Sequence, residues 1–185
     1  MATIKKISTA LILIYFAFTS DGCILDSFKT LPVNVATSIE FGASDIYFPS
    51  FPMNGEYCMS ESSDYMRYIN DIKKITYIGM IYRTTSVSPG LKANMLVTLT
   101  FNGVPFFSKT FTTFSPGNYS PPNRPLKFKL SQESKNLLNK FLNDSSIPPD
   151  QKCFEGTANV EIIDGTQPYS LNSVIDVALQ LDTKF

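Results

Sequence analysis

The sequence predicts an all-β fold, an antiparallel β-sandwich of about seven or eight short strands with one short helix in a connection. Apolar and polar residues alternate with a period of two in several segments, whereas a helical period occurs between residues 132 and 142. Pro, Gly and Asn residues separate these segments. Because strands do not alternate with helices along the chain, a parallel α/β sheet is excluded.

The first half of the domain is predicted to supply strands at 38–41, 45–48 and 72–85. The prolines and the Asn-Gly pair within 49–55 are typical of turns and are predicted to close the second of these strands. Residues 60–64 are polar and are predicted to form a loop. Both faces of the 72–85 segment are apolar in part, which favours a central strand over an edge strand.

The next segment, residues 91–112, predicts a β-hairpin. Apolar residues alternate with polar ones up to the pair Asn102 and Gly103, and both of these residues tolerate the positive φ of a type I′ turn. A two-residue turn predicts two cross-strand pairs, Phe101 with Val104 and Leu99 with Phe106.

The C-terminal part predicts a short strand at 126–130, a helix at 132–142, and strands around 158–162 and 175–181. A serine directly before the helix is predicted as its N-cap. Residues 115–125 contain four prolines and are predicted to form a long loop.

The composition narrows the classes of function. The chain has 185 residues, with 16 Lys and Arg, 16 Asp and Glu, and no His or Trp. Its 43% of hydrophobic residues are enough for a core, and its balanced charge gives no support to a nucleic-acid partner. The lack of His excludes Ser-His-Asp and Cys-His catalysis and His-metal sites.

Residues 1–22 are predicted to be a secretory signal peptide. Lys5 and Lys6 precede an unbroken apolar run over 10–18, and no further charge follows until Asp21. A run of this length is too short for a stable membrane-spanning helix, which needs about 20 residues. A buried N-terminal helix is the alternative interpretation.

Gly22 and Cys23 end this segment and resemble a bacterial lipobox, in which the cysteine is acylated and becomes the mature N-terminus. Ser20 and Asp21 depart from the family pattern, which has Leu and a small residue at these positions. The resemblance implies a lipid on Cys23 and an extracytoplasmic lipoprotein of the cell envelope or cell surface. Cleavage after Thr19 is the alternative and would release a secreted protein.

After the signal peptide, residues 23–36 are predicted to form the lipid anchor and tether, and residues 37–185 a single β-sandwich domain. Within this domain, Cys58 and Cys153 are predicted to form a disulfide in an oxidising compartment, which closes a loop of about 95 residues. Two unpaired buried thiols are the alternative. Two distant cysteines without His offer too few ligands for zinc, so no metal site is predicted.

Four aromatic residues in a segment rich in Pro and Gly are the candidate binding residues: Tyr47, Phe48, Phe51 and Tyr57. Exposed rings in such a segment stack on glycans or insert into protein partners, where aromatic side chains supply much of the binding energy. The alternative is that these rings cover the end of the core, next to Cys58.

A second aromatic cluster consists of Phe106, Phe107, Phe111 and Phe114. These four residues cannot all lie on the same face of a regular strand. Part of the cluster is therefore predicted to lie on the opposite side, against another sheet or a hydrophobic ligand. This prediction keeps a carrier of lipid or another hydrophobic ligand open as an alternative function.

The sequence contains no phosphate-binding loop, nucleophile elbow or EF-hand spacing. Ser131 and Lys135 are one residue too far apart for a Ser-x-x-Lys pair and fit an N-cap and a solvated helix face. Asp144, Asp150 and Glu155 are the candidate carboxylates of a His-free hydrolase, with solvated loop charges as the alternative. We expect no enzyme activity and no cofactor.

Together these features predict a non-catalytic, extracytoplasmic β-sandwich that is lipid-anchored and works by binding. Its predicted partners are the membrane, through the N-terminal lipid, and an unknown protein or glycan, with no nucleic acid among them. A carrier for a hydrophobic ligand and a secreted hydrolase that uses carboxylates are the two alternative functions.

Overall fold

The computed structural model describes residues 30–184. The strands are β1 (Thr30–Ile46), β2 (Ser50–Cys58), β3 (Ile72–Val87), β4 (Lys92–Phe101), β5 (Val104–Phe114), β6 (Leu126–Phe128), β7 (Cys153–Asp164) and β8 (Tyr169–Lys184). The helical segments are η1 (Met59–Glu61), α3 (Ser63–Tyr68), η2 (Pro116–Tyr119), α4 (Gln132–Leu142) and η3 (Pro149–Gln151).

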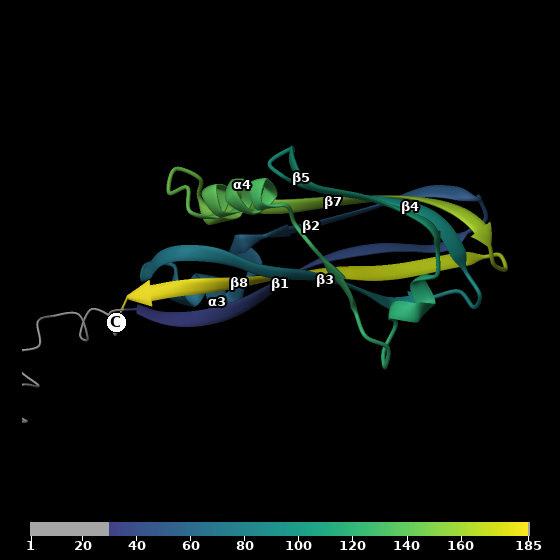
Figure 1. Ribbon diagram of the computed structural model, residues 1–185, viewed down its shortest axis with the longest axis horizontal. Helices are drawn as coiled ribbons and strands as arrows, with labels where there is room; N and C mark the ends of the chain where they lie inside the picture. The colour runs from purple at the N-terminus through teal and green to yellow at the C-terminus, as the bar shows by residue number, and fades with distance from the viewer. Residues whose placement is uncertain (1–29, 185) are drawn as a thin grey trace, which may run out of the picture.

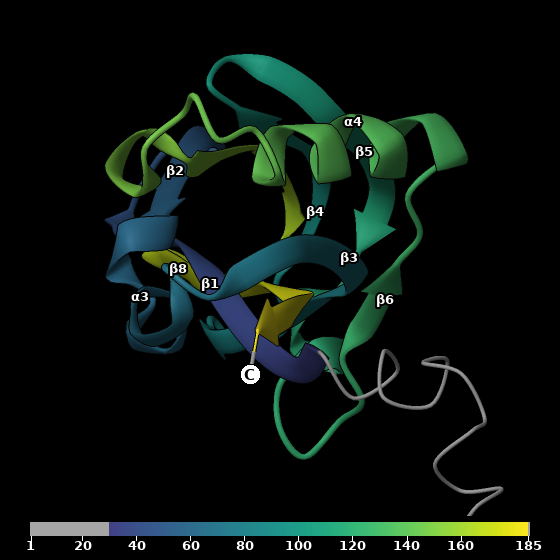
Figure 2. The same cartoon turned by 90° about the vertical axis from the view of Figure 1, so that its left-hand side faces the viewer.

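The eight strands form two four-stranded antiparallel sheets that pack face to face (Figures 1 and 2). Sheet A has the order β1-β8-β3-β6, and sheet B has the order β2-β7-β4-β5. The predicted antiparallel β-sandwich is therefore confirmed. The segment predicted as a central strand is β3, which has β8 on one side and β6 on the other.

The long strands run along the long axis of the molecule, so the sandwich has two different ends (Figure 1). One end, which we call the base, contains the start of β1, the end of β8, the β4–β5 turn and the helices α3 and α4. The other end, which we call the tip, contains the β1–β2, β3–β4 and β7–β8 connections. Residues close together in the sequence can thus lie at opposite ends of the molecule.

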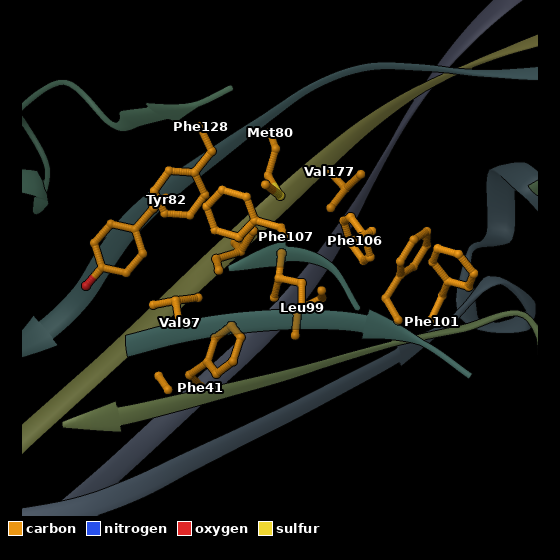
Figure 3. Packing of buried hydrophobic residues seen from close by; sticks show 14 of the residues in the cluster. Phe41, Met80, Tyr82, Val97, Leu99, Phe101, Phe106, Phe107, Phe128 and Val177 are labelled. Carbon is orange, nitrogen blue, oxygen red and sulfur yellow. The ribbon is translucent and has the colours of Figure 1, made fainter. Parts of the chain in front are cut away.

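The core lies between the sheets and is rich in aromatic rings (Figure 3). Phe107 of sheet B stacks on Phe128 of sheet A with ring centroids 4.7 Å apart, and Tyr82 of sheet A meets Phe114 of sheet B edge-on at 5.6 Å. Beside Tyr82 the sheets enclose a cavity of about 10 Å³. This space holds about one water molecule and is far too small for a lipid chain.

The first strand begins before the predicted start of the domain. Residues 30–36 pair with residues 178–184 of β8, so the tether predicted over 23–36 is wrong for residues 30–36. Pro32 is compatible with this strand because β1 lies at the edge of sheet A, with β8 on one side only.

The two strands predicted at 38–41 and 45–48 are joined in β1, which ends at Ile46. The turn predicted within 49–55 is wrong, because these residues belong to β2 apart from the first of them. A proline is tolerated there since β2 is an edge strand of sheet B. The glycine, Gly55, has a structural role: a Cβ at this position would overlap the backbone carbonyl of Glu40 in β1.

Two predictions concern the segments that are helical in the structure, and one of them is confirmed while the other is wrong. The helix predicted at 132–142 is α4, and Ser131 caps it, since its Oγ accepts a hydrogen bond from the Ser134 N–H at 3.0 Å. The loop predicted at 60–64 instead contains the last two residues of η1 and the start of α3. Ser62 forms the N-cap of α3 and accepts from the Tyr65 N–H at 3.2 Å, which is why this polar segment becomes helical.

The predicted β-hairpin is confirmed as β4 and β5. Its turn residues Asn102 and Gly103 have φ angles of 46° and 75°, and Phe101 pairs with Val104 as predicted. Both turn residues can adopt positive φ without a large steric penalty, which explains why this element is predicted well.

Irregular pairing in β5 redirects its aromatic side chains. Leu99 pairs with Phe107 rather than Phe106, because β5 contains an extra residue here. Phe106 and Phe107 are consequently both buried, although they are consecutive. A second register shift occurs before Phe114, which is also buried, and Phe111 packs against the core. The prediction that part of this cluster lies on the opposite face is therefore wrong.

Helix α4 takes the place of a neighbouring strand near the base, because β6 pairs with only a short part of β3 (Figure 2). Asn143 Oδ1 accepts from the Ile75 N–H, and Asn143 Nδ2 donates to the Ile75 carbonyl, both at 2.7 Å. Asn139 Oδ1 accepts from the Tyr77 N–H at 2.8 Å. These two amides satisfy backbone groups of β3 that no strand reaches.

Asn143→Ala is expected to lower the free energy of unfolding by about 2 kcal/mol, because both backbone groups of Ile75 lose their partners. Asn118→Ala is the matched control. Both residues begin Asn-x-Ser sequons, but Asn118 is exposed and its side chain makes no hydrogen bond within residues 30–184. Urea unfolding of both variants measures the difference, and equal midpoints would contradict the role given to Asn143.

Candidate functional site

The four candidate aromatic residues lie in different parts of the molecule. Tyr47 and Phe48 form part of the β1–β2 connection at the tip and are 62% and 74% exposed. Phe51 is buried in the core, and Tyr57 is half-buried at the base end of β2, next to Cys58. Because β2 runs from the tip to the base, the structure brings only Tyr47 and Phe48 of these four together at the surface.

Hydrogen bonds between neighbouring connections hold the backbone of the tip. Gln167 Nε2, in the β7–β8 connection, donates to the Tyr47 carbonyl at 3.0 Å. The Ile162 N–H of β7 donates to the Pro49 carbonyl at 2.7 Å. The two exposed rings are therefore presented on a fixed backbone, which lowers the entropic cost of ordering them in a complex.

A third apolar side chain, Ile163, extends this surface. The bond between Ile162 and Pro49 continues the β2–β7 ladder beyond its last paired residues, and by this register Phe48 lies opposite Ile163. Ile163 is 50% exposed. We define Tyr47, Phe48 and Ile163 as the tip patch. Ile163 is not among the binding residues predicted from the sequence. Its signal in the sequence is a second isoleucine directly after Ile162, which already continues the inward-facing series of β7.

The rim of the tip patch is charged. Asp164, which follows Ile163, forms an exposed ion pair with Lys92 Nζ at 3.2 Å. An exposed apolar centre with a polar rim is typical of surfaces that bind other proteins.

The predicted disulfide between Cys58 and Cys153 is confirmed and lies at the base, where these residues pair in the β2–β7 ladder. Such a bond indicates a non-cytoplasmic protein. Glu56 lies beside it, and the three ligand atoms are within 4.8 Å of one another. The two sulfurs are bonded to each other, so they are not available as metal ligands while the disulfide is intact.

The candidate catalytic residues are not assembled into a site. Ser131 caps α4, as described above, and Asp144 Oδ1 accepts from the Ser146 N–H at 2.9 Å and from its hydroxyl at 2.6 Å. These hydrogen bonds hold the pKa of Asp144 below its usual value. Glu155 Oε2 accepts from a threonine on β4, and Asp150 is exposed in η3. Within residues 30–184, these three carboxylates do not form a close cluster.

A hollow of about 640 Å³ lies on the outer face of sheet A. The small residues Ala36, Gly79 and Ala178 line its centre. Asp176, at its edge, accepts a hydrogen bond from Arg83 Nε at 2.8 Å. The hollow is an apolar surface whose carboxylate is already paired, and it offers no arrangement for acid–base chemistry.

The predicted signal peptide and the predicted lipidation site Cys23 lie outside the described residues. Among residues 30–184, no helix has the length and apolar character that crossing a membrane would require.

Comparisons with known proteins leave the chain without an assigned family. No family model matches it, and no curated protein matches it. Among solved structures, it is similar to a chain from desmodium yellow mottle tymovirus, with 6% sequence identity and a TM-score of 0.37 over 84% of this chain and 90% of that chain. At this TM-score, the likeness carries no argument about function.

Proposed function

We propose that this protein is a non-catalytic, extracytoplasmic β-sandwich that is anchored to a membrane through a lipid on Cys23 and binds a protein partner with its tip patch. The observation that carries this proposal is the position of the patch. Tyr47 and Phe48 are exposed at the end of the sandwich opposite to Thr30, where the chain enters β1.

The proposed anchor precedes β1 in the sequence, whereas the tip patch lies beyond the other end of β1. Thr30 follows Cys23 by seven residues, so a lipid on Cys23 would tether the base by a short segment. β1 has 17 residues and rises about 3.3 Å per residue, which places its two ends about 50 Å apart. A lipid on Cys23 would hold the base near the membrane and the tip patch away from it, where a partner can reach the patch.

The disulfide and the candidate catalytic residues support the other parts of the proposal. The Cys58–Cys153 bond fits an oxidising compartment outside the cytoplasm. Ser131 has a capping role and the candidate carboxylates are dispersed, which favours binding over catalysis.

The chemistry of the tip patch favours a protein over a glycan as the partner. The Phe48 and Ile163 side chains contain no polar atoms, whereas sugar hydroxyls that are buried in a complex need hydrogen-bond partners. Aromatic side chains that insert into a partner supply a large share of the energy of protein–protein binding.

Metabolic labelling with a palmitate analogue tests the anchor. We expect label on the wild-type protein and none on Cys23→Ala, which is expected to move from the membrane fraction to the soluble fraction. An unlabelled mature protein, or a Cys23→Ala variant that stays with the membranes, would overturn the lipid anchor.

Phe48→Ser is expected to weaken partner binding by about 30-fold, or about 2 kcal/mol. The free energy of unfolding is expected to change by less than about 0.5 kcal/mol, because the ring is exposed. Val104→Ser is the matched control, since Val104 is exposed at the base, on the β4–β5 hairpin. A photo-crosslinking residue placed at position 48 or 104 in intact cells identifies the partner, and titration with that partner measures the affinities.

The outcomes separate the alternatives. A discrete protein adduct from position 48 that is absent from position 104 supports the proposal. Similar adducts from both positions, or none from position 48, would overturn it. Binding to a glycan array that Phe48→Ser abolishes would replace the protein partner with a glycan.

A further inference from the structure

A pocket of about 370 Å³ opens at the base, between α3, the start of β3 and the connection from α4 to β7. Its lining is about equally polar and apolar, and the apolar part includes Ile69, Ile72 and Ile147. The polar residues of the lining are Lys152, Tyr65, Lys73, Asn143 and Ser145. Lys152 and Tyr65 are the two of these that are buried. The volume is near the lower limit of the range of about 300–1,000 Å³ for small-molecule sites.

Lys152 is a buried cation with few partners. Its side chain lines the pocket although the residue is only 5% exposed. Nζ donates to the carbonyl of Leu142, in the last turn of α4, at 2.9 Å. Within residues 30–184, the Lys152 ammonium makes no other hydrogen bond and no salt bridge. A lysine ammonium has three donors, so two remain for a ligand.

The backbone around Lys152 holds the side chain at the pocket. Its carbonyl accepts from the Met59 N–H at 2.9 Å, and the next residue, Cys153, is fixed by the disulfide. Asp144 is the nearby carboxylate, but its Oδ1 is occupied by the hydrogen bonds to Ser146. A buried ammonium is unfavourable unless a counter-charge or further hydrogen bonds offset its lost hydration. Burial accordingly lowers the pKa of Lys152.

Tyr65 adds a second polar group without a partner. It lines the pocket, is 4% exposed, and its hydroxyl forms no hydrogen bond with another residue of the described part of the chain. Burial raises the pKa of this hydroxyl, so it stays protonated at neutral pH and can donate a hydrogen bond.

We infer that this pocket binds a small monocarboxylate with an apolar body, whose carboxylate pairs with Lys152 Nζ and accepts a hydrogen bond from Tyr65. The apolar body would contact Ile69, Ile72 and Ile147. The inference does not depend on the proposed function of the tip, which lies at the other end of the sandwich.

The lining of the pocket selects this class of ligand. Of the two lysines in the lining, Lys73 is exposed and Lys152 is buried, so the pocket presents one buried ammonium. A single buried ammonium matches a single negative charge, whereas phosphate groups are usually bound by several cations or by arginine. The isoleucine wall favours a ligand with an aliphatic chain over a fully polar acid such as acetate. The modest volume favours a medium-chain carboxylate over a long-chain lipid.

Calorimetric titration with octanoate tests whether the pocket recognises both the carboxylate and the aliphatic chain of the ligand. We expect saturable one-to-one binding of octanoate at submillimolar concentration. Acetate has the charge without the chain, and octanol has the chain without the charge, so both are expected to bind at least about tenfold more weakly. No saturation with millimolar octanoate, or equal binding of octanol, would overturn the inference.

Variants connect this binding to the pocket. Lys152→Met is expected to weaken octanoate binding by about tenfold or more, and Tyr65→Phe by a few-fold. Lys140→Met, which removes an exposed lysine from the last turn of α4, is the control and is expected to bind like wild type. If Lys152→Met does not fold, Ile147→Trp replaces it, because a larger side chain would fill the pocket. Unchanged affinity in a folded Lys152→Met or Ile147→Trp variant would place the ligand elsewhere and overturn the assignment.

Discussion

Breaking the Cys58–Cys153 disulfide is expected to lower the free energy of unfolding by about 4 kcal/mol. The bond joins residues that are 95 apart in the sequence, and so it removes many conformations from the unfolded chain. In the folded protein the two residues are already neighbours in the β2–β7 ladder. Loss of the bond therefore leaves the backbone pairing in place, and most of the effect comes from the greater entropy of the unfolded state.

Urea unfolding of the oxidised protein, the reduced protein and the double variant Cys58→Ser/Cys153→Ser measures this effect. We expect the reduced protein and the double variant to agree, because both lack the cross-link. The same midpoint before and after complete reduction would contradict the prediction. A double variant much less stable than the reduced protein would instead attribute the effect to contacts of the cysteine side chains in the folded state.

The parts of the fold that the sequence predicts well have local causes. Asn102 and Gly103 form the hairpin turn because their own φ angles determine it. Ser131 begins α4 because an N-cap needs only the backbone of the next turn. The alternation of β7 and β8 is also local, since each strand has one face toward the core.

The parts that were predicted wrongly depend on residues far along the chain. The Pro and Gly residues of β2 resemble a turn, but β2 is an edge strand and Gly55 faces the backbone of Glu40. Phe106 turns inward because of an extra residue in the pairing of β5 with β4. Neither the edge position nor the bulge can be inferred from the local pattern of apolar residues.

The candidate sites also combine features that the local sequence indicates with features that depend on residues far along the chain. The sequence indicates Tyr47 and Phe48 because they are aromatic residues in a turn-rich segment. Tyr57 lies far from them because β2 runs to the base, and Phe48 lies opposite Ile163 because the pairing of β2 with β7 continues to Pro49. The pocket around Lys152 has no sequence signal, since a single lysine is usually solvated and its burial depends on several elements that are distant in sequence.

Gly55→Ala is expected to lower the free energy of unfolding by about 3 kcal/mol. An added Cβ would overlap the carbonyl oxygen of Glu40 and would lie 3.0 Å from Cγ2 of Ile39. A backbone carbonyl cannot swing away as the end of a flexible side chain can, so β1 would have to move off β2. Gly156 pairs with Gly55, and Gly156→Ala is expected to cost a similar amount because its Cβ would overlap the buried ring of Phe41.

Gly79→Ala is the control for Gly55→Ala, because it replaces glycine by alanine within a strand without a steric overlap. Alanine is favoured over glycine within a strand by about 0.5–1 kcal/mol, and a Cβ at Gly79 meets nothing within 4 Å. Gly79→Ala is therefore expected to leave the free energy of unfolding unchanged or to raise it slightly, whereas Gly55→Ala lowers it. Urea unfolding of the variants compares them directly. If Gly55→Ala were as stable as the wild type, β1 and β2 would not approach closely at this edge, and the packing of the two sheets there would differ from the one described.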